Sequence, residues 1–526
     1  MSAETIQILI AMIVYMGIVI AIGIYYAKRA NKSSDEYYLG GRSLGPWVTA
    51  MSAEASDMSG WLLMGLPGVA YWFGLADAAW TAIGLAIGTY LNWLFVSKRL
   101  RRYSIRVKNS ITLPDFFSNR FRETKPVIML ISSSFILIFF TVYAASCLVT
   151  CGKLFSTLFD APYILMMLLG AVFVLVYTIL GGFLAESASD FMQAIVMISA
   201  LAVIVIVATV SAGGIGAVIS NAKNIPGFLE FFNLASPVVD EAGTQIVQNG
   251  SPMFGEASPY GALTIASMLA WGLGYFGMPQ VLLRFMAIRR ENELKASRRI
   301  AMVWVVISLA VAVFIGIVGR QLFPVAHLTK SSAESIFITL ATSSLPAIIA
   351  GFVMAGILAA TISSSDSYLL IAASALSKNI YQGAVKKKAS DKQVMLISRI
   401  TLVVLTLIAA LIALDENSII FSIVSFAWAG FGATFGPLVI FSLFWKRINK
   451  MGAIAGMIGG GAMVFIWKLG LAKIGGVFAI YELLPAFVFS SICIVVVSLL
   501  TAPPSKEIEE DFEAVRSGEV DAKSIS

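Results

Sequence analysis

The most informative part of the chain is the stretch at residues 49–61, which reads TAMSAEASDMSGW. It lies inside an apolar run, 44–70, and about 20 apolar residues are enough for a helix to cross a bilayer. The stretch nevertheless contains Glu54 and Asp57, and a carboxylate inside a membrane span is a candidate functional group because its burial is costly. Close helix packing would explain the small residues here but not the two acids. We therefore expect a helix interrupted near Gly60, whose free carbonyl groups can bind a cation.

The composition places the whole chain in a membrane. Of its 526 residues, 58% are hydrophobic and 13% are charged, whereas a soluble protein has about 25% charged residues. So few charges cannot cover the surface of a soluble protein of this size. A soluble enzyme, a disordered chain and a nucleic-acid-binding protein are therefore excluded, despite the net charge of +7.

Apolar runs near the length of a membrane span recur along the chain, which predicts an all-α integral membrane protein with 13 transmembrane helices. The first run has no basic residue before it and is expected to be retained rather than cleaved as a signal peptide. We expect one transporter domain over 1–501 and a short, flexible cytoplasmic tail over 502–526. The predicted spans are 6–27, 44–70, 75–96, 127–156, 162–180, 185–213, 259–287, 300–320, 344–377, 396–414, 417–445, 451–470 and 478–501.

The distribution of positive charge predicts the orientation, because cytoplasmic loops are enriched in Lys and Arg. With the N-terminus outside, 31 of the 37 Lys and Arg residues fall in cytoplasmic segments, and the C-terminus is also cytoplasmic. The longest outer loop, 214–258, contains Glu230, Asp240, Glu241 and Glu256 against Lys223.

The seventh run contains a second interruption. Residues 267–280 include three glycines and Pro279, and this run follows the second run by five spans. This spacing is typical of two five-helix halves with inverted topology, which bind solute and ions where their broken helices meet. Trp271 and Tyr275 are four residues apart, so both lie on one helical face and suit a small organic solute.

The ninth and sixth runs also carry polar groups. Ser363, Asp366 and Ser367 share one helical face, and their hard oxygen atoms suit Na⁺ rather than a transition metal. Asp190 lies within the cytoplasmic half of the sixth run and needs a partner, whereas Glu186 is expected to be solvated at the membrane edge.

Other chemistries have little support. The lone histidine, His327, is interpreted as structural, and the three cysteines form neither a disulfide framework nor a metal-binding pair. The chain has no zinc-protease motif and no nucleotide-binding loop, so an enzyme, an ATP-driven pump and an organic cofactor are not expected. A solute sensor that does not transport remains an alternative, although the chain has no signalling domain.

Six stretches of this chain resemble the sodium:solute symporter family, most closely its sodium/proline branch. The resemblance implies a core of two inverted five-helix repeats, about 44–213 and 259–445, with one helix before it and two after it. The stretches are LGGRSLGPWVTAMSAEASDMSGWLLMGLPG (39–68), ITLPDFFSNRF (111–121), GGFLAESASDFMQ (181–193), WGLGYFGMPQVLLRFM (271–286), ILAATISSSDSYLL (357–370) and AWAGFGATFGPLVIFSLFW (427–445).

The same resemblance implies three groups of site residues. The main Na⁺ site would take backbone carbonyls of Ala55, Met58 and Ala360 and hydroxyls of Ser363 and Ser364, with Asp57 important for Na⁺ use. A possible second Na⁺ site would take Asp190, Ser363, Asp366 and Ser367. The residues expected to line the solute pocket are Glu54, Ser59, Trp61, Tyr143, Trp271, Tyr275, Gln280 and Trp428.

Two departures from the proline branch bear on the solute. Glu54 stands where Gly is typical, and Met278-Pro279-Gln280 stands where Gln-Pro-His is typical. We expect a Na⁺-coupled importer of proline or a similar small amino acid, working by alternating access in the cytoplasmic membrane of a bacterium. Its partners would be the solute, Na⁺ and the lipid bilayer, with the oligomeric state open and a monomer possible. The alternative solutes are another amino acid, a carboxylate or a vitamin-like acid, coupled to Na⁺ or H⁺.

Overall fold

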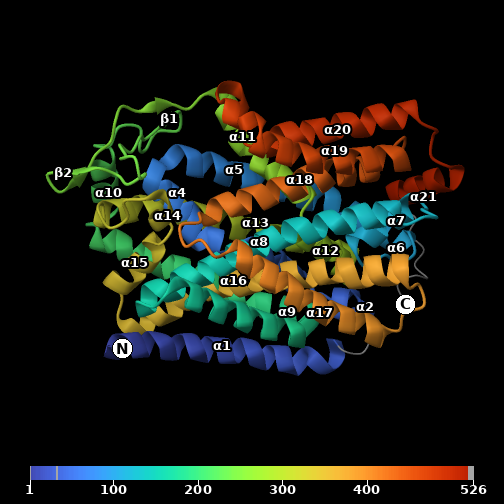
Figure 1. The fold of residues 1–526 in the computed structure, drawn as a ribbon, viewed down its shortest axis with the longest axis horizontal. Coiled ribbons are helices and arrows are strands. Elements are labelled where there is room, and N and C mark those ends of the chain that lie inside the picture. Colours follow the sequence, from blue (N-terminus) through green and yellow to red (C-terminus); the bar gives the residue numbers. More distant parts are fainter. Residues whose placement is uncertain (1, 31–33, 519–526) are drawn as a thin grey trace.

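The computed structural model describes residues 2–30 and 34–518, and Figure 1 shows a bundle of long helices that run in roughly the same direction. The N-terminus lies at the left end of the bundle in this view, and the described chain ends at the right end. The all-α class is therefore confirmed. Lys32, which contributes to the charge count above, and the last part of the predicted tail, 519–526, lie outside the described residues.

Helices account for nearly all of the regular structure in the part that is described. The α-helices are α1 (Ala3–Ala30), α2 (Ser34–Leu39), α3 (Pro46–Asp57), α4 (Leu66–Phe73), α5 (Leu75–Leu91), α6 (Ser97–Arg106), α7 (Leu113–Arg120), α8 (Val127–Phe159), α9 (Tyr163–Ser211), α10 (Ile215–Ala222), α11 (Ala262–Leu269), α12 (Pro279–Ala287), α13 (Leu294–Leu322), α14 (Lys330–Ala333), α15 (Ile336–Ser344), α16 (Ala347–Ser374), α17 (Asp391–Ile412), α18 (Ile420–Phe444), α19 (Lys450–Leu469), α20 (Leu483–Leu500) and α21 (Lys506–Ser517).

Within the described chain, ten helices are long and apolar enough to cross a membrane. Three shorter apolar helices, Trp61–Phe73, Tyr163–Ile179 and Ala262–Phe276, coincide with the second, fifth and seventh predicted spans. Every predicted span therefore overlaps a helix. Two of these short helices, Trp61–Phe73 and Ala262–Phe276, belong to predicted spans that a break divides into pieces.

The interruption expected near Gly60 is present. Helix α3 ends at Asp57, Met58 has non-helical angles (φ −86°, ψ 75°), and a π-helical turn at Trp61–Gly65 leads into α4. A Cβ atom at Gly60 would lie 2.4 Å from the Thr150 hydroxyl of α8, so glycine is needed for this close approach. The break is thus set by packing against another helix as well as by local sequence.

The second interruption lies between α11 and α12. A 3-10 segment, Ala270–Phe276, follows α11, and Pro279 then begins α12. A Cβ atom at Gly272 would lie 2.2 Å from the Gly84 carbonyl oxygen of α5, so the two backbones touch here. Proline suits the first turn of α12 because its missing N–H would have no helical partner there.

Helix α9 is divided at Gly182, whose backbone (φ 60°, ψ −178°) turns the chain between the fifth and sixth predicted spans. The long loop that follows α9 contains α10 and two small antiparallel strand pairs. Strand β1 (Asn233–Leu234) pairs with β4 (Ser258–Pro259), and β2 (Val247–Gln248) pairs with β3 (Ser251–Pro252). These short strands lie at the same end of the bundle as the N-terminus (Figure 1).

The helices differ in how deeply they lie in the bundle. In the most apolar 18 residues of the spans that contain α16 and α18, 78% and 83% of the residues are buried. The corresponding values for α1, α19 and α20 are 33%, 28% and 28%. The first helix and the last two spans therefore flank a central group of helices, with α1 and α20 at opposite edges in Figure 1.

The prediction that the tail is flexible is wrong for residues 506–517. These residues form α21, which packs against α6 and buries Ile508, Phe512 and Val515. The error arose because the tail is short and charged, but its apolar residues recur at helical spacing and its acids find basic partners on the bundle.

The close approach of α5 and the second break gives a test of the fold. We expect Gly272→Val to lower the melting temperature of the purified protein sharply, because its side chain would collide with backbone atoms of Gly84 and Gly88. Gly17→Val in α1 is the matched control, since a Cβ atom at Gly17 meets nothing within 4 Å. Equal melting temperatures for the two variants would contradict this packing.

Candidate functional site

The residues expected to form the main Na⁺ site meet where the break after α3 approaches α16. The Ser363 hydroxyl donates to the Ala55 carbonyl oxygen over 2.8 Å, and the Ser364 hydroxyl reaches the same oxygen over 3.3 Å. Ser363 also lies 3.2 Å from the Ala360 carbonyl oxygen of its own helix. Four of the five expected oxygen donors are thus brought together, although Ala55 and Ser363 are 308 residues apart.

The fifth donor, Met58, lies at the break itself. Its sulfur accepts hydrogen bonds from Trp304 Nε1 at 3.1 Å and from the Ser308 hydroxyl at 3.5 Å, which ties the end of α3 to α13. Its ψ of 75° departs from a helical value, so its carbonyl group is free of the α3 ladder. The residues present therefore fit a Na⁺ ion, with hydroxyl and carbonyl oxygens from both helices.

The Asp57 carboxylate is directed toward the second break. Tyr275 donates its hydroxyl proton to Asp57 Oδ2 over 2.8 Å, and Gln280 Nε2 lies 3.5 Å from Oδ1. The Asp57 carbonyl oxygen accepts from Trp61 Nε1 at 3.2 Å. Asp57 thus links the two broken helices. Among the described residues, its hydrogen-bond partners are residues expected to line the solute pocket, and not Ser363 or Ser364.

Aromatic side chains from two helices form one wall beside Asp57. The Tyr275 ring meets the Trp428 ring edge-on at 4.9 Å, and Trp428 Nε1 donates to the Trp271 carbonyl oxygen at 2.8 Å. Trp271 also stacks on Tyr481 at 4.9 Å, a contact that the sequence analysis missed. Tyr481 precedes α20, far from the matched motifs, and no spacing pattern in the sequence points to it.

Three buried polar atoms near this wall have no hydrogen-bond partner within the described residues. They are the Ser59 hydroxyl, the Tyr143 hydroxyl and Gln280 Oε1. The Tyr143 ring stacks on Tyr368 of α16 at 4.2 Å, and the Tyr368 hydroxyl is also unpartnered. Buried polar groups are normally satisfied, so such a set indicates atoms that a bound solute or water would satisfy.

Glu54 is buried beside this region and contacts Trp93, in the segment that follows α5. Its Oε1 accepts from Trp93 Nε1 at 3.2 Å, whereas its Oε2 has no partner within the described part of the chain. Trp93 packs in turn against Phe285 of α12 at 4.5 Å. The carboxylate therefore keeps one oxygen available for a proton, a cation or an ammonium group.

The expected second Na⁺ site contains a cation that the sequence analysis placed elsewhere. Arg284 was included among the 31 positive charges assigned to the cytoplasm, although it falls at the end of the predicted span 259–287. Its side chain is fully buried where α12 meets α3, α9 and α16. Its guanidinium donates to Ser52 at 3.0 Å, to Asp190 at 3.1 Å and to Ser367 at 3.0 Å, and it also pairs with Glu186. The signal in the sequence was the apolar stretch on both sides of this arginine, VLLRFMAI.

The interpretation of Glu186 as a solvated residue at the membrane edge is wrong. Glu186 is 3% exposed, and its Oε1 pairs with Arg284 and accepts the Ser367 hydroxyl. Ionised carboxylates are buried only when paired, so the arginine explains why Glu186 lies inside. Asp190 also accepts from Ser52 at 2.7 Å, which connects α9 to α3.

This cluster contains more carboxylates than cations. Glu186, Asp190 and Asp366 are all buried, and each keeps one oxygen without a hydrogen-bond partner among the described residues. Asp366 also accepts the backbone N–H of Ser367 at 2.7 Å. One guanidinium cannot neutralise three ionised carboxylates, so the cluster suits a further small cation or a bound proton.

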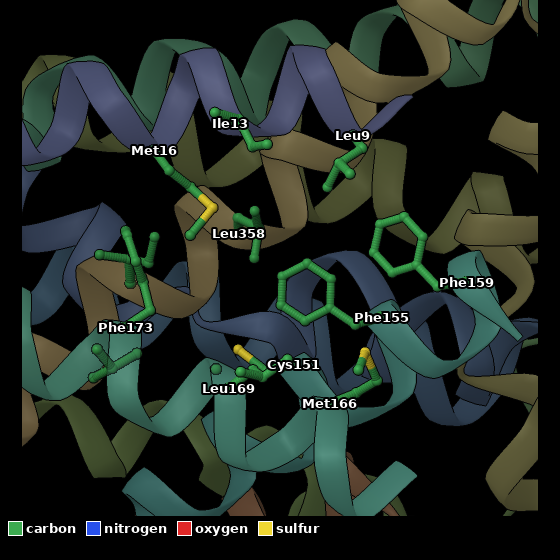
Figure 2. A pocket seen from close by; sticks show the side chains of 13 residues that line it. Leu9, Ile13, Met16, Cys151, Phe155, Phe159, Met166, Leu169, Phe173 and Leu358 are labelled. Carbon is green, nitrogen blue, oxygen red and sulfur yellow. The ribbon is translucent and has the colours of Figure 1, made fainter. Parts of the chain in front are cut away.

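A separate cavity of about 370 Å³ lies between α1, α8, α9 and α16 (Figure 2). Its lining includes Ile13, Phe155, Leu169 and Leu358, and the Cys151 thiol is its most polar side chain. An amino acid would lose its hydration here without gaining hydrogen bonds. This cavity is therefore excluded as the solute pocket.

His327 lies outside the spans, in the loop after α13. Its Nε2 hydrogen-bonds Thr339 at 2.8 Å, and its ring lies 5.9 Å from that of Tyr71. Burial, reinforced by the nearby Arg320 charge, lowers the pKa of His327 to about 4. The ring is therefore neutral near pH 7. It packs against Tyr71 and Thr339, which agrees with its interpretation as a structural residue.

Comparison with known proteins identifies the class. The model of the sodium:solute symporter family matches residues 37–460, so the chain belongs to that family. It is 41% identical to the sodium/proline symporter of Haemophilus influenzae (98% of this chain, 99% of the relative) and 40% identical to the osmoregulated proline transporter OpuE of Bacillus subtilis (95% and 96%). It is therefore a multi-pass membrane transporter and not an enzyme.

The fold is shared with a solved transporter. The substrate-bound, outward-open structure of a Na⁺-coupled sialic acid symporter matches with a TM-score of 0.74, covering 95% of this chain and 99% of that one. The sequence identity is 19%, so this likeness concerns the fold.

The hydroxyl groups of α16 give a direct test of the main cation site. We expect Ser363→Ala and Ser364→Ala each to raise the Kd for Na⁺ about tenfold, which corresponds to about 1.4 kcal/mol for a lost ligand. Binding of radioactive Na⁺ to the purified protein measures this. Ser365→Ala is the matched control, because its hydroxyl bonds to the Ile362 carbonyl of its own helix. An unchanged Kd in both test variants would place the site elsewhere.

The buried cluster gives a second test. Arg284→Gln should destabilise the protein by about 3–5 kcal/mol, because Glu186 and Asp190 would lose their cation. Thermal unfolding in detergent measures the loss, with Arg290→Gln at an exposed position as the control. Combining Arg284→Gln with Glu186→Gln should recover part of the loss if the pair is coupled. Additive losses would show that the two side chains act independently.

Proposed function

We propose that this protein is a Na⁺-coupled symporter that imports proline or a similar small amino acid by alternating access. The observation that carries the proposal is the meeting of the two helix breaks. At that point Ser363 and Ser364 approach the Ala55 carbonyl, while Asp57 on the same broken helix binds Tyr275 of the other. The names of the relatives, which include the high-affinity proline transporter PutP of Bacillus subtilis (40% identical over 489 residues), support proline as the solute.

We infer that all thirteen predicted segments cross the membrane, with inverted repeats over about 44–213 and 259–445. The matching positions of the breaks, one in the first helix of each repeat, support this arrangement. The opposite ends reached by the N-terminus and α21 support an odd number of crossings (Figure 1). The excess of Lys and Arg at the α21 end supports a cytoplasmic C-terminus and an outer N-terminus.

The transport step would begin when Na⁺ enters from outside. Na⁺ would take the Ala55 and Ala360 carbonyls and the Ser363 and Ser364 hydroxyls as ligands, in place of the hydrogen bonds now between them. Because these ligands come from α3 and α16, the ion would hold the two helices in one arrangement. Asp57 follows two residues after Ala55, so the same event would fix its carboxylate for the solute.

The solute pocket has groups for each part of an amino acid. The Asp57 carboxylate, shared with Tyr275, would attract the solute's ammonium group, and the Ser59 and Tyr143 hydroxyls are available as hydrogen-bond partners. The Tyr275 and Trp428 rings would cover an apolar ring such as that of proline. The Na⁺ gradient and the membrane potential, worth about 2.3 kcal/mol per charge per 100 mV, would drive uptake.

We propose a weaker second cation site in the Arg284 cluster. Asp190, Asp366 and Ser367 would supply its oxygen atoms, together with the unpartnered Oε2 of Glu186. Arg284 already provides one positive charge there, so a second Na⁺ would meet more repulsion than at the main site.

Uptake of radioactive proline into proteoliposomes tests the proposal. We expect accumulation only with an inward Na⁺ gradient, and a loss on the order of tenfold in Asp57→Asn, a change of about 1.4 kcal/mol. Glu241→Gln, at an exposed position of the outer loop, is the matched control. Equal uptake with and without the gradient would contradict Na⁺ coupling.

A different solute is the second candidate, and the unpartnered oxygen of Glu54 favours it. An additional buried carboxylate could pair with a second cationic group of the solute. Competition by unlabelled amino acids, carboxylates and vitamin-like acids in the same vesicles distinguishes the two. Stronger competition by another compound than by proline would replace proline as the solute.

A further inference from the structure

Helix α21 crosses the end of the bundle that carries most of the positive charge. It packs against α6 and lies near α6, α7 and the end of α20 in Figure 1. Five of its twelve residues are acidic: Glu507, Glu509, Glu510, Asp511 and Glu513. The surface beneath it is basic, so the helix and the bundle have complementary charges.

Asp511 is the centre of this contact. Its Oδ1 accepts from Arg106 Nε at 2.9 Å, and its Oδ2 accepts from Arg122 Nη2 at 2.9 Å. Arg122 also pairs with Glu507 at 2.7 Å. Arg106 ends α6 and Arg122 follows α7, so one carboxylate connects the two helices that precede α8.

A second contact reaches the other half of the protein. Lys446, in the turn between α18 and α19, lies 3.1 Å from Glu509 and 3.9 Å from Glu513. Helices α6 and α7 belong to the first proposed repeat, whereas α18 ends the second. α21 therefore bridges the cytoplasmic ends of both repeats.

An apolar seam adds to the ion pairs. Ile508, Phe512 and Val515 of α21 are buried on the side of the helix that faces the bundle. The Arg120 guanidinium lies 4.9 Å from the Tyr103 ring and 5.8 Å from the Phe512 ring, so it is held between α6 and α21. This seam fixes the place of the helix, while the ion pairs contribute a part that salt can weaken.

The layer beneath α21 closes this end of the bundle. Arg102 pairs with Glu291 at 2.5 Å, and Arg101 donates to the Ile288 carbonyl oxygen at 2.7 Å. Both contacts join α6 to the turn that follows α12, the broken helix of the solute site. Under the proposed function, solute leaves at this end of the bundle, where α21 packs on α6.

We propose that α21 is an electrostatic latch that holds the cytoplasmic ends of the two repeats together and loosens as ionic strength rises. The proposal rests on the proposed function, because release of solute to the cytoplasm requires these ends to separate. The side chains of Arg122, Glu507 and Lys446 are 45%, 66% and 45% exposed, so solvent ions reach the pairs that they form, whereas the Asp511 side chain is 11% exposed. Salt weakens such exposed pairs most when the Debye length, about 3 Å at 1 M, becomes comparable with the separation of the charged atoms.

Hydrogen exchange of the full-length protein tests the latch without transport. KCl is raised from about 0.01 M to about 1 M, which shortens the Debye length from about 30 Å to about 3 Å. The amides of 506–517 should exchange on the order of tenfold faster at high salt, as expected for a local opening, while those of α16 stay protected. Unchanged exchange of 506–517 would overturn the latch.

Two variants make the test specific. Asp511→Asn removes the central carboxylate and should show fast exchange of 506–517 already at low salt. Glu510→Gln is the matched control, because Glu510 is exposed and has no ion pair among the described residues, and it should exchange as the unaltered protein does. The same exchange in both variants would overturn the role of Asp511.

Uptake at low salt then tests the effect on transport. In vesicles of low ionic strength, the Asp511→Asn variant should import the solute about two- to fivefold faster than the unaltered protein. At high salt the difference should disappear, because screening then weakens the same ion pairs in the unaltered protein. Fast exchange without any change in uptake would overturn control of transport by α21. Absence of proline uptake in the unaltered protein would instead count against the proposed function, since the exchange result does not depend on it.

Discussion

A broken helix inside a bilayer must satisfy its free backbone groups with protein, because lipid offers no hydrogen bonds. This constraint organises the centre of the molecule. The break after α3 exposes the Ala55 carbonyl, and the Ser363 and Ser364 hydroxyls of α16 donate hydrogen bonds to it. The break before α12 approaches the first one through Tyr275 and Asp57. The proposed ion site and the proposed solute site therefore arise from the same structural requirement.

Buried charge imposes a second constraint on the same helices. Arg284, Glu186 and Asp190 join α12 to α9, while Ser52 and Ser367 bring α3 and α16 into the same cluster. A movement of any one of these helices would have to rearrange the others or leave a charge unpaired. The cluster thus couples the broken helices α3 and α12 to α9 and α16.

Much of this could be predicted from the order of residues alone, because membrane rules act locally. Length and hydropathy placed the spans, and glycine with proline marked Gly60, Gly272 and Pro279 as positions of breaks. The fate of individual charges was harder to predict. Arg284 and Glu186 lie near span ends and therefore resemble solvated residues in the sequence. They are each other's partners, but 98 positions separate them in the chain, so only the fold brings them together. The tail was misjudged for a similar reason, since Asp511 gains its partners from α6 and from the segment after α7.

The sequence by itself determined that the chain is a membrane transporter with two interrupted helices, because burial in lipid penalises each exposed charge and each unpaired backbone group residue by residue. Only the tertiary structure decided which polar groups share a site. Asp57 was expected beside the ion ligands, and packing turned its carboxylate toward Tyr275 instead. Packing likewise brought Arg284 into the carboxylate cluster. The physical reason is that side-chain partners are chosen by helix contacts between distant segments, which hydropathy and spacing do not encode.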